Sequence, residues 1–144
     1  MSIKDYVLKE KDYIISLRRE FHKYPELSLQ EYKTAKKIEE ELDKLNIPHK
    51  RIGDTGVLGV IKGANSSGKV IALRADIDGL KVPDGKEVEY KSQNEGYHHA
   101  CGHDGHTASL LGTAKILKER ENQLNGEVRL FFQQAEEIGQ GAKI

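Results

Sequence analysis

The stretch KVIALR, residues 69–74, places four apolar side chains in an unbroken row. A strand with one face in water alternates apolar and polar residues, whereas a continuous apolar run is typical of a strand covered on both faces. Residues 57–61 (VLGVI) form a similar run, and residues 63–68 (GANSSG) predict a turn between the two strands. We therefore expect a sheet that lies between layers of helices.

Segments with helical periodicity precede these strands. Residues 3–23 place apolar side chains at mostly helical spacing, and Pro25 is expected to stop this amphipathic helix. Ser28 and Glu31 have the spacing of a capping box, which predicts a second helix over residues 29–45.

The pattern continues beyond the strands. Residues 78–96 are polar and are expected to be mostly loop, and residues 106–120 return to helical spacing. A strand is predicted over residues 128–132, with a helix beginning near Glu136. The interleaved strands and helices favour an α/β layered domain, and 144 residues fit one domain.

The composition argues against several classes of partner. Acidic and basic residues number 23 each, so no basic field indicates nucleic acid or an anionic membrane. We find no apolar run of membrane-spanning length and no apolar signal-peptide core, so a cytoplasmic protein is expected. The single cysteine, Cys101, allows no internal disulfide and can serve as a ligand, a nucleophile or a buried side chain.

Residues 97–106 (YHHACGHDGH) contain that cysteine, four of the six histidines and a carboxylate. Thiolate, imidazole and carboxylate are together the ligand set of a transition metal, zinc most often. Cys101 and His103 are two residues apart with a glycine between them, so both can reach one ion from an extended loop. This stretch is therefore our candidate for the functional site.

Two acidic pairs are expected to face it. Asp76 and Asp78 follow one predicted strand, Glu136 and Glu137 follow another, and open α/β sheets bind ligands beyond the carboxyl ends of their strands. Adjacent glutamates point in different directions, so one can hold a metal while the other deprotonates its water. One aspartate could orient a ligating histidine, and the other could be a ligand or pair with Arg74.

Each of these residues has a simpler interpretation. Cys101 could be a small buried side chain or half of a Cys–His nucleophilic dyad, and the glutamate pair could only complement a helix dipole. His106 is expected to cap or line a helix start. His98 and His99 are expected to support the site or face solvent, and a hydrogen bond from one of them to a substrate oxyanion is a further alternative. His22 and His49 are interpreted as surface or helix-packing residues.

Four blocks occur in the order in which they stand in a known family: residues 17–28 (LRREFHKYPELS), 74–78 (RADID), 99–107 (HACGHDGHT) and 132–137 (FQQAEE). The chain resembles the N-terminal part of the metal-dependent aminoacylase and carboxypeptidase-like amidohydrolases. That family includes hippurate hydrolase, N-acetyldiaminopimelate deacetylase and indole-acetyl-amino-acid hydrolases.

The resemblance implies a layered helix/sheet/helix catalytic domain of the zinc-peptidase type, with two divalent ions (Zn, Mn, Ni or Co) per full-length subunit. Cys101, His103 and Glu137 match ligand positions, and Glu136 matches the general base. Asp78, with Asp76 as the alternative, matches the residue that supports the site. The implied reaction is hydrolysis of a small N-acyl amino acid to a carboxylate and a free amino acid.

The chain also departs from the family pattern. Gly79, Gln134 and His98 replace alanine, proline and methionine, and we expect these changes to touch the rim and alter substrate preference. Family members are nearly three times as long. Residues 1–144 are therefore interpreted as the N-terminal part of the catalytic domain. The inserted lid and dimerisation domain, the C-terminal part and further histidine ligands are expected to be absent.

The 144-residue chain is accordingly expected to be inactive alone, and a full-length form could be a homodimer. Two other classes stay open. A non-catalytic metal-binding or interaction module would tolerate loss of Glu136, and a thiol hydrolase would resist chelators but be silenced by alkylation of Cys101.

Overall fold

Four strands form one mixed sheet in the computed structural model, which describes residues 1–65 and 68–144. The strands β1 (His49–Ile52), β2 (Gly56–Lys62), β3 (Asn65–Asp76) and β4 (Asn125–Gln133) lie in the order β1-β2-β4-β3. The inner strand β4 is antiparallel to its neighbour β2 and parallel to its neighbour β3. Its Gln133 pairs with Asp76 of β3. The residues that follow β3 and β4 therefore leave the sheet at the same end.

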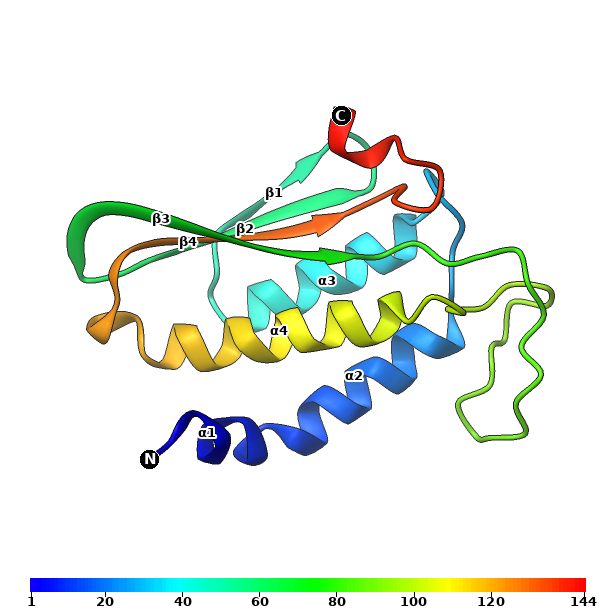
Figure 1. Cartoon of the computed structure of the whole chain (residues 1–144), viewed down its shortest axis with the longest axis horizontal. Coiled ribbons are helices and arrows are strands. Elements are labelled where there is room, and N and C mark those ends of the chain that lie inside the picture. The colour runs from blue at the N-terminus through cyan, green and yellow to red at the C-terminus, as the bar shows by residue number, and fades with distance from the viewer.

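Four α-helices lie along one face of this sheet (Figure 1). They are α1 (Ile3–Lys9), α2 (Lys11–Lys23), α3 (Tyr32–Lys44) and α4 (His103–Glu119), with short 3-10 turns at Glu121–Gln123 and Gly141–Lys143. The contacts run from α3 to β2, from α4 to β3 and from α2 to α4, so α2 reaches the sheet mainly through α4.

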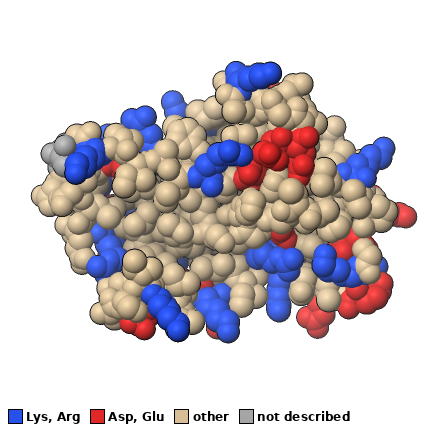
Figure 2. Space-filling model, viewed as in Figure 1, with Lys and Arg blue, Asp and Glu red and all other residues tan. Residues whose placement is uncertain are grey.

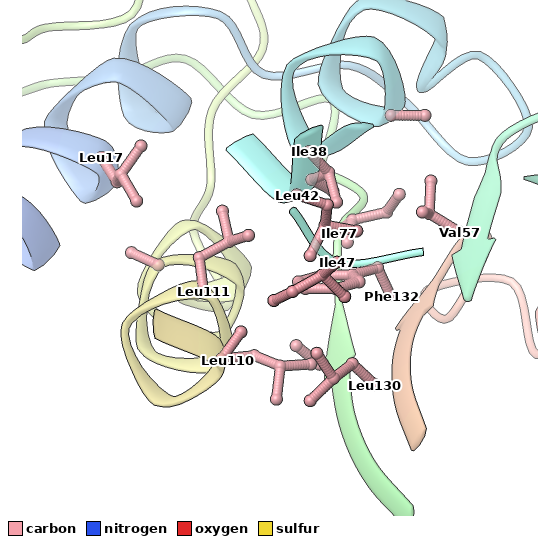
Figure 3. Packing of buried hydrophobic residues seen from close by; sticks show 14 of the residues in the cluster. Leu17, Ile38, Leu42, Ile47, Val57, Ile77, Leu110, Leu111, Leu130 and Phe132 are labelled. Atoms are coloured by element: carbon pink, nitrogen blue, oxygen red, sulfur yellow. The ribbon is translucent and has the colours of Figure 1, made fainter. Parts of the chain in front are cut away.

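The core fills the space between these helices and the sheet (Figure 3). Ile38 and Leu42 of α3 and Leu111 of α4 are fully buried, as is Leu130 of β4, and Phe132 is 1% exposed. Burying a side chain of this size contributes about 1.5–3 kcal/mol. This packing fixes the ends of β3 and β4, where the acidic pairs begin.

The predicted α/β class is confirmed, but β3 differs from its expected surroundings. It is one of the two edge strands of the described sheet, and its Val70 and Ile71 are 49% and 60% exposed. The helices of the described residues cover only one face, so residues 69–74 are not covered on both faces as expected. The turn predicted over residues 63–68 includes Ser66 and Ser67, which lie outside the described residues.

Three further predictions of local structure are wrong. The helix predicted over residues 3–23 is interrupted at Glu10, whose buried carboxylate pairs with Lys115 of α4 at 2.8 Å. No helix begins near Glu136, because residues 136–139 form a turn. The Ser28–Glu31 capping box is absent from α3, and Glu26 instead accepts the N–H of Thr34 at 2.6 Å.

The structure bears on one prediction made from the composition, the absence of a membrane-spanning segment. Among the described helices, none combines the length and the apolar character that crossing a membrane requires. Figure 2 shows one compact group of acidic side chains toward the end of the sheet where β3 stops and further acidic side chains at the lower right of the view, with lysines and arginines spread over the visible face.

Candidate metal centre

His103, the first residue of α4, is the buried centre of the candidate site at 2% exposure. Its Nδ1 lies 2.9 Å from the carbonyl oxygen of Asp78 and 3.2 Å from that residue's Oδ1. Because both neighbours are acceptors, Nδ1 carries the proton and Nε2 is left free. Nε2 faces three carboxylates, at 3.6 Å from Glu136, 3.8 Å from Glu137 and 3.9 Å from Asp76.

Cys101, His103 and Glu137 lie close enough to share one ion. The sulfur, a ring nitrogen and a carboxylate oxygen are all within 4.8 Å of one another. Oε1 of Glu137 is buried and, among the described residues, has no hydrogen-bond partner. A buried carboxylate oxygen without a partner is costly, so this donor set fits a cation. Their role as ligands stays a prediction.

Asp78 connects three segments around this pocket. The carboxylate is 1% exposed, and its Oδ2 accepts the hydroxyl of Ser28 at 2.7 Å and the N–H of Glu137 at 3.0 Å. Burial raises the pKa of Asp78, but hydrogen bonds from His103, Glu137 and Ser28 outweigh it, so the pKa lies below its usual value. Asp78 is thus an ionised carboxylate that orients His103.

Asp76 has different contacts. Its Oδ1 accepts Nε–H of Arg74 at 3.0 Å, while its Oδ2 faces His103 and His106. Of the two aspartates weighed from the sequence, Asp78 is therefore the one whose contacts hold the His103 ring in place. Asp76 is the one that pairs with arginine.

Without a cation, the pKa values of the Cys101 thiol and the His103 imidazole both lie above their ordinary values. The negative charge of Glu137, then burial and the charges of Glu136 and Asp76, raise the pKa of the Cys101 thiol. Burial lowers the pKa of His103, but the hydrogen bonds to Asp78 and the negative charges of Asp78 and Asp76 outweigh it and raise it. A thiol with a raised pKa is a poor nucleophile at neutral pH, which argues against a thiol hydrolase.

Residues 72–144 match the sequence pattern of peptidase family M20/M25/M40. The chain belongs to this family. It is 46% identical to thermostable carboxypeptidase 1 of Saccharolobus solfataricus, over 95% of this chain and 35% of that protein. It is 47% identical to N-acetylcysteine deacetylase of Bacillus subtilis, over 90% of this chain and 34% of that protein.

Among solved structures, the chain is similar to the Bacillus subtilis YXEP protein, described as a dinuclear metal binding peptidase from the M20 family. The TM-score is 0.88 at 45% identity, and the match covers 92% of this chain and 37% of that one. The chain thus spans about a third of the length of the curated relatives it matches. The fold described above is the fold of this part of an M20/M25/M40 peptidase.

A second group of potential ligands overlaps the first in this M20/M25/M40 chain. Asp76, His103 and His106 also place one ligand atom each within 4.8 Å of the others. The two groups share His103, whose Nε2 can bind one ion at a time. His106 lines the first turn of α4 but does not cap it, because the N-cap is Gly102 at φ 83°, with no side-chain cap bond.

Sequence reasoning missed His22. This residue of α2 is fully buried, with Nδ1 2.7 Å from Asp104 and Nε2 2.9 Å from Asp84. Arg18 also reaches Asp104, at 2.9 Å. The prediction that His22 lies at the surface is therefore wrong, whereas the alternative prediction of a helix-packing role is consistent with its burial. The sequence signal that could have found His22 is its position within residues 17–28, one of the four blocks shared with the family.

One further histidine, His99, and one departure from the family pattern, Gln134, differ from expectation, whereas His49 does not. His99 is 5% exposed, so it does not face solvent, and burial lowers its pKa to about 4. His49 makes a surface pair with Asp43 at 2.8 Å, in line with its interpretation. Gln134 does not lie at a rim, because it is 2% exposed and donates to the carbonyl of Ile52.

Proposed function

We propose that the protein containing these residues is a metal-dependent amidohydrolase that cleaves the amide bond of N-acyl amino acids. The single observation that carries the proposal is the position of Glu136. Its carboxylate lies 3.6 Å from Nε2 of His103, beside the Cys101, His103 and Glu137 group, while its side chain remains 38% exposed. A carboxylate that borders a cation site and is open to solvent suits a general base.

The donor set is compatible with a divalent ion held by Cys101, His103 and Glu137. Such an ion supplies Lewis acidity, lowering the pKa of a water and polarising a carbonyl group. The mixture of sulfur, nitrogen and oxygen suits zinc, manganese, nickel and cobalt. By analogy with the dinuclear relative, we propose two ions in each full-length subunit.

The chain's own residues then divide the remaining work. Glu136 takes a proton from the attacking water and returns it to the leaving amine, a role typical of a carboxylate at such a centre. Asp78 keeps Nδ1 of His103 protonated and its Nε2 directed at the pocket. The N–H of Glu137, bonded to Asp78, keeps the glutamate pair beside the histidine.

N-acyl amino acids are proposed as substrates from the resemblance and from the name of the deacetylase relative. Since the chain covers 34–35% of these relatives, the remaining ligands and the domain that closes over substrate are proposed to lie outside residues 1–144. The 144-residue chain by itself is then expected to show no turnover, and measurable metal-dependent hydrolysis of an N-acetyl amino acid by it would contradict this part.

The test is Glu136→Gln in the longer protein, assayed on acetyl, benzoyl and indole-acetyl amino acids alongside elemental analysis. Loss of a general base lowers kcat by about 10²–10⁴-fold, with the metal retained. Glu137→Gln is the matched control, and it should lose metal together with activity. A Glu136→Gln protein with full activity would overturn the assignment, and a protein with bound metal but no hydrolysis of any amide would indicate a non-catalytic module.

A further inference from the structure

Glu31 is a fully buried carboxylate that the sequence pattern assigned to a helix cap. It makes no cap bond. Instead, its Oε1 accepts the backbone N–H of Ala135 at 2.8 Å, and its Oε2 accepts the hydroxyl of Thr55 at 2.7 Å. Glu31 therefore links the start of α3 to the residue directly before Glu136.

Ala135 has an unusual backbone conformation. Its φ of +50° lies in the left-handed region, which a residue with a Cβ rarely adopts. Surrounding contacts must over-determine such a conformation if it is to persist. Two of them are on the carbonyl, which accepts the N–H groups of Gln140 and Gly141 at 3.2 Å each, and the third is the N–H donated to Glu31.

The direction of the glutamate pair depends on this turn. The chain leaves β4 at Gln133, reverses through Ala135 and then presents Glu136 and Glu137 to His103. Asp78 holds the N–H of Glu137, so the acidic segment has a buried carboxylate at both of its ends. Glu31 accepts a hydrogen bond from the backbone just before the two glutamates, whereas Asp78 accepts one from the second glutamate and contacts His103.

We infer that Glu31 is a positioning residue, whose buried carboxylate holds Ala135 in the left-handed conformation and so aims Glu136 and Glu137 at the Cys101 and His103 side chains. The inference rests on the proposed function, because it assigns Glu31 to the same centre. Both of its partners donate hydrogen bonds, which a carboxylate can accept without supplying a donor of its own.

The test uses the 144-residue chain and two measurements. One is exchange of the Glu137 amide proton, which is bonded to Asp78 and not to Glu31. The other is titration with Co²⁺, followed by the absorbance of a cobalt–thiolate bond to Cys101. Glu31→Leu removes both acceptors at similar volume, and we expect exchange at Glu137 to quicken by about tenfold or more. Co²⁺ affinity should fall by about 10–100-fold, the range for residues that orient ligands.

Three companion variants separate positioning from general stability. Thr55→Val removes the other hydrogen bond of Glu31 and should leave Co²⁺ affinity and Glu137 exchange near wild type. Glu31→Gln should do the same, because its amide oxygen accepts from Ala135 while its amide group donates to Thr55. Ala135→Gly in the Glu31→Leu chain should restore most of the lost affinity, since glycine adopts positive φ without steric cost.

The outcomes distinguish this inference from the proposed function. Unchanged exchange and affinity in Glu31→Leu, or no restoration by Ala135→Gly, would overturn the positioning role while leaving the metal site in place. If the wild-type chain and the longer protein both bind no Co²⁺ but Glu137 exchange responds as described, positioning of the acidic segment stands and the proposed metal function falls. Loss of affinity in Thr55→Val equal to that in Glu31→Leu would also overturn the inference.

Discussion

Asp78 and Asp104 are equally buried, at 1% exposure each, yet they serve different neighbours. Asp78 accepts from Ser28, from the backbone of Glu137 and from His103, so its bonds converge on the candidate metal centre. Asp104 faces Arg18 and His22 on α2. Burial alone therefore does not show whether an acid supports a site or a fold. The hydrogen-bond and ion-pair partners of the carboxylate distinguish the two roles.

The largest expected effect tests the Asp104 side of this comparison. His22→Ala removes the imidazole that separates Asp104 from Asp84 and leaves both carboxylates buried without it. Removing one partner of a buried pair lowers the free energy of unfolding by about 3–5 kcal/mol. Urea unfolding measures this loss. The Co²⁺ affinity of the folded protein should change little. A large drop in affinity would show that Asp104 and its partners also support the candidate metal centre.

A smaller effect is expected on the Asp78 side. Asp78→Asn keeps the side-chain volume but removes the negative charge beside His103, and metal affinity should fall by about 10–100-fold. Asp104→Asn is the matched variant, and it should lower stability more than affinity. Competition with a chelating indicator measures the affinities. The opposite ranking of the two variants would reverse the assignment of the two carboxylates.

The smallest effect sharpens the comparison through pH. Ser28→Ala removes one of the hydrogen bonds that lower the pKa of Asp78, at a cost near 1 kcal/mol at pH 7. A carboxyl whose folded pKa is lowered stabilises the fold above its unfolded pKa, and that stabilisation is lost as pH falls through the folded value. The difference between Ser28→Ala and wild type should therefore shrink as the pH falls through the folded pKa values of Asp78 in the two proteins, which lie below the ordinary aspartate pKa of about 4.

Urea unfolding at pH 7 and over a series of pH values that descends from about pH 4 measures this shrinkage. Thr113→Ala is a suitable control, because the Thr113 hydroxyl donates to a helix carbonyl at Ser109 and its loss involves no titrating group. A difference for Ser28→Ala that stays constant with pH would show that Asp78 gains nothing from this bond in its charged form.

The convergence of the site segments could be predicted because it follows from simple chain geometry. Asp76 and Asp78 follow β3, Glu136 and Glu137 follow β4, and the two strands are parallel neighbours. The spacing of Cys101 and His103 likewise predicted that both reach one pocket. These inferences need only strand direction and local spacing, which are visible in the sequence.

The failures lie where a distant partner overrode a local rule. Ser28 and Glu31 match a capping box, but Ser28 instead bonds to Asp78 and Glu31 to Ala135, both distant in the sequence. The helix predicted from Glu136 is replaced by a turn, because Ala135 is left-handed and the N–H of Glu137 is bonded to Asp78. Likewise, periodicity places His22 on α2 without revealing that two carboxylates lie beside it.

The bond between Glu31 and Ala135 also has a consequence for the order of assembly, because it joins residues 104 positions apart. Contacts of such long range form only after the intervening loop has closed, at an entropic cost that local helices do not bear. Helices α1 to α3 can therefore gain structure while the chain is still emerging from the ribosome. The group of Cys101, His103 and Glu137 is completed only when β4 enters the sheet, because Glu137 follows that strand.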